Sequence, residues 1–177
     1  MLLVLNGAPG VGKSALAARY ARDHTLTMVV EIDDLRRQLG QWETTDATKA
    51  IARELALALV TDHLGRGSDV VVPQYLGRRE FADRLRGVAE DAGARFVEAV
   101  LVDEDDAVIA RFRTRRAELA AAGGRHPQAD LADDDIAPTI RAANAGLRRD
   151  AAAYDLPLIP TGSGIEAAYK ALLARVE

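Results

Sequence analysis

The chain has 177 residues, 49% hydrophobic and 28% charged, so it holds enough apolar material for one core and is too short for two ordinary domains. Its 27 acidic and 23 basic side chains leave a net charge of −4, which disfavours nucleic acid as the main partner. The absence of cysteine excludes disulfides, thiolate zinc sites and cysteine nucleophiles, and the three histidines show no metal-ligand spacing. We therefore expect a single domain over residues 1–177, in which any metal is bound by oxygen.

The sequence shows no signal for secretion or for the membrane. The first apolar run, MLLVL, is too short for a signal peptide and lacks its basic region. No stretch approaches the ~20 apolar residues that a membrane-spanning helix needs. We expect a cytoplasmic protein with no membrane partner.

Short β-branched runs alternate with longer segments of helical periodicity along the whole chain. This alternation predicts an α/β fold, in which helices cover both faces of a five-stranded parallel sheet and form a three-layer sandwich. The strands are expected at residues 2–5, 28–32, 69–73, 95–103 and 156–161.

A helix is expected after each strand, and for two of these helices the sequence makes more detailed predictions. In the helix after residue 46, Ile51, Leu55, Leu59 and Leu64 are expected to share one face, and Pro138 is expected in the first turn of a helix that runs to about Tyr154. The expected helical segments are 14–24, 35–39, 47–64, 78–93, 105–119, 138–154 and 163–177.

A phosphate-binding loop is predicted by GAPGVGKS, which matches G-x-x-x-x-G-K-S between the first strand and the first helix. Glycines allow successive amide N–H groups to converge on one phosphate, and the helix adds the positive end of its dipole. Lys13 is expected to reach the β- and γ-phosphates, and the Ser14 hydroxyl to bind a Mg²⁺ between them. The residues expected to bind the nucleotide are Gly7, Ala8, Pro9, Gly10, Val11, Gly12, Lys13, Ser14 and Ala15.

A pair of aspartates follows the second strand in EIDDLRRQ, at the edge of the sheet where ligands bind in open α/β folds. We expect Asp33 to end the strand and point into the crevice, where its carboxylate can take the proton of an attacking hydroxyl. Asp34 is expected to cap the short helix that starts at Leu35.

A lid is predicted at about residues 111–132, because a row of arginines precedes a segment rich in Gly, Pro and Asp without apolar periodicity. Arg111 and Arg115 lie one helical turn apart and are expected to stabilise the charge of the transferring group. Arg113 and Arg116 face elsewhere.

The third strand ends in VVVPQYL and lacks the aspartate that many P-loop proteins place there for the metal. Three explanations stay open: Asp33 also organises the metal's water shell, Asp103 does so at longer range, or Ser14 and the phosphates bind the metal alone. The other residues expected in the acceptor pocket are Arg36, Trp42, Gln74 and Tyr75.

The segments GAPGVGKS, IDDLRRQ and VLVDEDDAVIARFRTR resemble, in this order, those of the small P-loop kinases of the AAA_33 and zeta-toxin-like type, a group that includes chloramphenicol phosphotransferases and polynucleotide 5′-kinases. The resemblance implies a P-loop NTPase fold, ATP as donor, Asp33 as general base, Lys13 and Ser14 as phosphate and Mg²⁺ ligands, and Arg111 and Arg115 as lid arginines. VVVP without an acid is similar to the tunicamycin-resistance ATP-binding proteins. Thr161 and Gly162 occupy the place where related folds pass beside the nucleotide base.

These observations predict an ATP- and Mg²⁺-dependent phosphotransferase that acts on a hydroxyl of a small molecule, such as an antibiotic, a nucleoside or a sugar. Two alternatives stay open. One is a kinase for nucleosides, nucleotides or a polynucleotide 5′-hydroxyl, the last disfavoured by the acidic net charge. The other is a regulatory ATP-binding protein without kinase activity.

Overall fold

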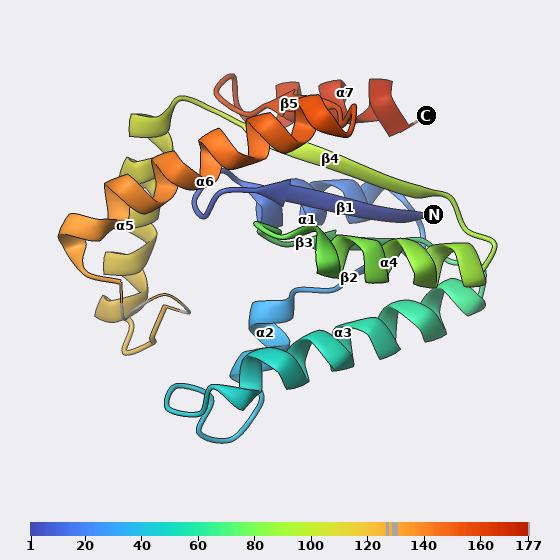
Figure 1. The fold of residues 1–177 in the computed structure, drawn as a ribbon, viewed down its shortest axis with the longest axis horizontal. Coiled ribbons are helices and arrows are strands. Elements are labelled where there is room, and N and C mark those ends of the chain that lie inside the picture. Colours follow the sequence, from blue (N-terminus) through green and yellow to red (C-terminus); the bar gives the residue numbers. More distant parts are fainter. Residues whose placement is uncertain (127, 129–130, 177) are drawn as a thin grey trace.

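The computed structural model describes residues 1–126, 128 and 131–176, and its centre is a single sheet of parallel strands (Figure 1). The strand order is β2-β3-β1-β4-β5. Because β1 pairs with β3 on one side and β4 on the other, the loop after β1 lies where the strand order reverses, which is the ligand-binding position of open α/β sheets. The strands are β1 (Leu2–Gly7), β2 (Met28–Val29), β3 (Val70–Pro73), β4 (Phe96–Val102) and β5 (Leu158–Pro160).

Helices cover both faces of this sheet, which confirms the predicted α/β three-layer architecture. Side chains alternate along β1: Leu3 and Leu5 pack with α1, α5, α6 and α7, while Leu2 and Val4 pack with α3 and α4. The helices are α1 (Lys13–Asp23), α2 (Ile32–Arg37), α3 (Ala47–Gly65), α4 (Arg79–Asp91), α5 (Asp105–Ala121), α6 (Asp133–Ala153) and α7 (Ile165–Val176).

The second strand is shorter than predicted, and α2 begins at Ile32 instead of Leu35. Asp33 and Asp34 therefore both lie in the first turn of α2, where the positive end of the helix dipole favours acidic residues. Asp34 does not cap the helix, and its carboxylate pairs with Arg37.

The buried face of α3 differs from the predicted one. Ile51 and Leu55 are 45% and 41% exposed, whereas Ala52, Ala56 and Val60 are fully buried. Small alanine side chains let a helix approach its neighbours closely, so α3 turns this face toward the sheet and α4. Of the four residues expected to share a face, Leu64 is buried and Leu59 is partly buried, so the prediction failed only at Ile51 and Leu55.

The helix after the predicted lid starts at Asp133, five residues before Pro138, so Pro138 lies inside α6 and not in its first turn. Three aspartates occupy that first turn and interact favourably with the helix dipole. The first half of the expected lid belongs to α5, and residues 127, 129 and 130 lie outside the described part of the chain. Within that described part, no helix has the length and apolar character to cross a membrane.

Candidate active site

The loop between β1 and α1 has the backbone of a phosphate-binding nest. Gly10 and Gly12 have φ values of 88° and 107°, in the left-handed region that glycine adopts without strain. Gly12 is the N-cap of α1, so the free N–H groups of the first helical turn face the same space as the loop amides. Figure 1 shows α5 and the start of α6 at the same end of the sheet as this loop.

Lys13 is the first residue of α1, and its side chain folds back over the loop. Its Nζ donates hydrogen bonds to the carbonyl oxygens of Gly7 and Ala8, both at 3.0 Å. Burial lowers the pKa of Lys13 from 10.5 to about 8, with a smaller lowering by Arg115, while Asp33 and Glu31 act in the opposite direction. A poorly solvated ammonium next to free amides is well suited to bind a triphosphate.

Two carboxylates lie close to Lys13 at the start of α2. Asp33 is half-buried and interacts electrostatically with Lys13 and His126, and its carboxylate forms no hydrogen bond or ion pair with another described residue. Glu31, the N-cap residue of α2, was not singled out from the sequence. Burial raises the pKa of Glu31, and a hydrogen bond with the Ser14 hydroxyl opposes that rise. The same hydrogen bond places Glu31 beside the predicted Mg²⁺ ligand.

Arg111 braces the phosphate loop in this structure. Its Nε donates to the carbonyl of Gly10 at 3.0 Å, and its Nη2 lies 2.6 Å from Oδ2 of Asp103. The Thr161 hydroxyl also lies near this carboxylate at 3.4 Å, and a Cβ on Gly162 would come within 2.6 Å of it. Asp103 is thus engaged in holding α5 and the residues after β5, whereas Glu31 is an acid that lies beside Ser14, the predicted metal ligand.

A second arginine of the expected lid segment, Arg115 on α5, lies near Lys13 of the phosphate loop. Arg115 influences the pKa of both Lys13 and His126. His126 packs edge-to-face on Phe112, with ring centroids 4.9 Å apart, and burial is the main cause of its lowered pKa. Arg125 lies 3.5 Å from Glu43, in the loop between α2 and α3, so an ion pair joins the lid to the opposite side of the crevice.

Arg36, predicted to bind the acceptor, is buried and engaged with the loop before α3. Its Nε donates to the Thr48 hydroxyl at 3.2 Å and its Nη2 to the Trp42 carbonyl at 3.1 Å. Its guanidinium also stacks on the Trp42 ring, 5.1 Å from the centroid. The geometry therefore supports a role for Arg36 in shaping the Trp42 loop.

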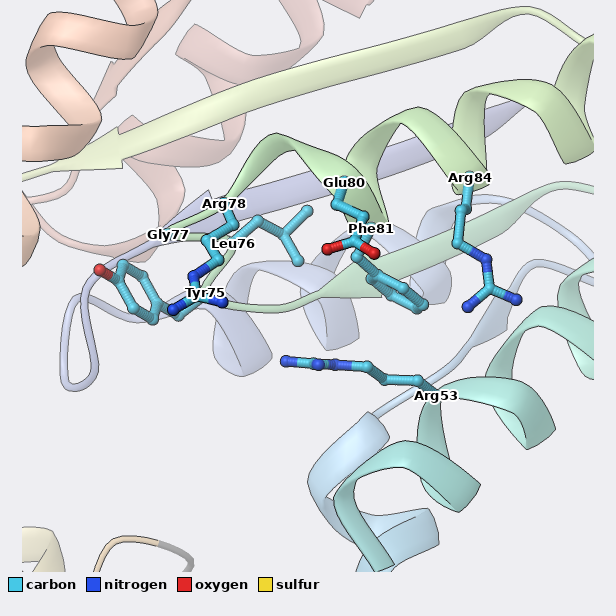
Figure 2. A pocket seen from close by; sticks show the side chains of 8 residues that line it. All are labelled: Arg53, Tyr75, Leu76, Gly77, Arg78, Glu80, Phe81 and Arg84. Atoms are coloured by element: carbon cyan, nitrogen blue, oxygen red, sulfur yellow. The ribbon is translucent and has the colours of Figure 1, made fainter. Parts of the chain in front are cut away.

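Gln74 and Tyr75 follow β3, as predicted, and Tyr75 lines a cleft of about 400 Å³ between α3 and α4 (Figure 2). The backbone N–H of Gln74 donates a hydrogen bond to the carbonyl oxygen of Leu5, on β1, at 3.1 Å. The residues lining the cleft are Arg53, Tyr75, Leu76, Gly77, Arg78, Glu80, Phe81 and Arg84.

A buried polar network, which the sequence analysis missed, connects β1, β4 and the loop after β3. Asn6 accepts a hydrogen bond from the backbone N–H of Leu76 at 2.9 Å and donates to the Leu76 carbonyl at 3.3 Å. It also donates to Oε1 of Glu98 at 3.1 Å, which forms an ion pair with Arg79 at 2.8 Å. The available signal was a single glutamate within the otherwise apolar strand FVEAVLV.

Comparison with known proteins identifies the family. Residues 2–133 match the model of the AAA_33 family, described as an AAA domain. The chain belongs to this AAA_33 family. An adenylate kinase of Deinococcus radiodurans is 31% identical over 142 residues, which cover 73% of this chain and 71% of that protein.

The fold of the AAA_33 protein is shared with solved structures of low sequence identity. A tunicamycin resistance protein of Deinococcus radiodurans superposes with a TM-score of 0.61 at 18% identity, over 99% of this chain and 94% of that one. A gluconokinase of Sinorhizobium meliloti gives 0.59 at 20% identity, over 98% and 91%. The predicted P-loop fold and the resemblance to the AAA_33 group of small P-loop kinases are therefore confirmed.

Proposed function

We propose that this protein transfers the γ-phosphoryl group of ATP to a hydroxyl of a small molecule, with Mg²⁺ as cofactor. The observation that carries the proposal is Asp33: a half-buried carboxylate close to Lys13 that no described residue binds. Its neighbour Asp34 is paired with Arg37. A carboxylate left without a partner beside a phosphate loop is available to accept a proton from the substrate.

The residues present fit a magnesium ion that shares its ligands with the nucleotide. The Ser14 hydroxyl and the Glu31 carboxylate beside it are oxygen donors, which Mg²⁺ prefers. No group of three or more His, Asp or Glu side chains among the described residues could hold a metal ion, so the phosphates would supply the remaining ligands. When bound, Mg²⁺ would neutralise charge on the β- and γ-phosphates.

The proposed reaction gives each of these side chains one role. The loop amides and Lys13 hold the β- and γ-phosphates, and Arg115 approaches from the lid. The acceptor oxygen attacks the γ-phosphorus while its proton passes to Asp33, and the bond to the β-phosphate oxygen breaks, leaving ADP. The lid excludes water, so that ATP is not hydrolysed.

Asp33→Asn is the decisive test of the base. We expect this variant to bind ATP like the wild type and to lose about 10²–10⁴-fold in turnover, because the amide cannot take the proton. The measurement is ADP release with an acceptor found by thermal-shift screening in the presence of a non-hydrolysable ATP analogue. Asp34→Asn is the matched control, since Asp34 is exposed and paired with Arg37. A rate equal to that of the wild type would remove Asp33 from the mechanism.

Arg115→Ala is expected to lower turnover by about 10²-fold with a small change in ATP affinity, because a lid arginine acts mainly on the charge of the transition state. The matched control is Arg113→Ala, an exposed arginine on another face of α5. Steady-state kinetics of both variants check this. Equal losses in the two would show that Arg115 acts only through the net charge of the lid.

A second candidate is a nucleotide kinase, favoured by the adenylate kinase relative at 31% identity. A phosphate acceptor is already ionised near neutral pH and needs no base. This candidate therefore predicts that AMP is phosphorylated and that Asp33→Asn retains most of its rate with AMP, which separates it from the first proposal.

A further inference from the structure

The cleft between α3 and α4 has an excess of positive charge, although the whole chain has a net charge of −4. Three arginines and one glutamate line it: Arg53, Arg78, Arg84 and Glu80. Arg84 is neutralised, because it forms a bidentate pair with Glu54 at 2.7 and 2.8 Å. The remaining charge comes from Arg53 and Arg78, against the single carboxylate of Glu80.

Neither of these two arginines has an acidic partner in the described part of the chain. Arg53 contacts the ring of Phe81, with the guanidinium 5.7 Å from the centroid, which orients the side chain along the cleft. The side chain of Arg78 forms no hydrogen bond or ion pair there, whereas that of the next residue, Arg79, is bound to Glu98. Figure 2 shows Arg53 extending from α3 and Arg78 from the loop before α4 toward the end of the cleft at Tyr75.

We propose that Arg53 and Arg78 bind an anionic group of the acceptor, a phosphate or a carboxylate, in this cleft. Arginine donates up to five hydrogen bonds in a planar geometry that matches both anions, and a charge-assisted bond is stronger than a neutral one. A neutral acceptor would desolvate both guanidinium groups without replacing the lost hydration. The inference rests on the proposed function and narrows its substrate class to small molecules that carry a negative group.

Inorganic phosphate is the first probe, titrated by calorimetry into protein saturated with Mg²⁺ and the ATP analogue AMP-PNP, so that the phosphate loop is already occupied. We expect binding to the wild type and at least a tenfold loss in the double variant Arg53→Gln/Arg78→Gln, since hydrogen bonds to charged groups are stronger than neutral ones and both guanidinium groups are removed. Arg86→Gln, which removes a charge from α4 outside the cleft, should bind phosphate like the wild type. No phosphate binding to the wild type, or equal binding by the double variant, would overturn the inference.

Two matched pairs of compounds then distinguish the kinds of anion. Ribose 5-phosphate is compared with ribose, and gluconate with glucose, under the same conditions. Preference for the phosphate ester identifies a phosphorylated acceptor, and preference for gluconate identifies a carboxylate; equal binding within both pairs would contradict the role of charge.

The AMP-PNP titration that precedes these measurements tests the proposed function separately. If the analogue does not bind, the phosphate-loop assignment fails whatever the cleft does. If it binds equally well to wild type and double variant, while phosphate binding does not respond to Arg53 and Arg78, only the acceptor inference fails.

Discussion

Replacing Lys13 by alanine is expected to lower phosphoryl transfer by about 10³-fold and to weaken nucleotide binding at least tenfold. Lys13 is expected to reach the β- and γ-phosphates, and its ammonium is held over the loop by the carbonyls of Gly7 and Ala8. Burial has already removed part of its hydration, as its pKa of about 8 indicates, so bringing it against a triphosphate costs little further desolvation. Binding of a fluorescent ATP analogue and ADP release measure the two effects.

Lys49→Ala is the matched control for that experiment. Lys49 is exposed and pairs with Asp46 at 3.5 Å on the surface of α3, far from the loop in the sequence. It should bind nucleotide and turn over like the wild type. Nucleotide binding by Lys13→Ala at wild-type strength would mean that the loop does not hold a triphosphate.

Replacing Glu98 by alanine is expected to lower the free energy of unfolding by about 3–5 kcal/mol, because it leaves a buried charge without its partner. The Glu98 side chain is 0% exposed and that of Arg79 is 18% exposed, so water compensates only in part for the lost ion pair. Asn6 also loses one of its acceptors. Thermal unfolding should show a fall in Tm of roughly 6–20 °C for a chain of this length.

The ion pair between Arg84 and Glu54 supplies a control with similar chemistry and a different environment. Its shortest distance is 2.7 Å, against 2.8 Å for Arg79 and Glu98, but both of its side chains are about half exposed. Glu54→Ala should cost less than about 1 kcal/mol. Replacing Arg79 and Glu98 together by leucine should recover much of the stability lost in Glu98→Ala. Equal losses in Glu98→Ala and Glu54→Ala would show that burial of the network is unimportant.

Through Asn6, the network of Glu98 and Arg79 also contacts the candidate active site. It precedes the phosphate loop directly, and it holds both backbone groups of Leu76, next to Tyr75 in the cleft. Loss of Glu98 is therefore expected to disturb the spacing between the nucleotide loop and the acceptor cleft as well as stability.

The sequence by itself determined those features that are formed by residues adjacent in the chain. The phosphate loop needs glycines, a lysine and a serine at fixed spacing between a strand and a helix, and all of these are neighbours in the chain. The strands were also readable, because short β-branched runs in a parallel sheet are buried on both faces.

Only the tertiary structure decided which charged side chains are committed to partners and which stay available. Arg78 and Arg79 are adjacent in the sequence, but Glu98 on β4 pairs with Arg79. Arg111 and Arg115 share a spacing, but Asp103 binds Arg111. Such pairings join segments whose distance in space is set by the packing of the helices on the sheet, and the face that α3 buries is set in the same way. The periodicity of a segment indicates which of its residues share a face of one helix or strand. The partner of a charged side chain on another element depends on how all the elements pack.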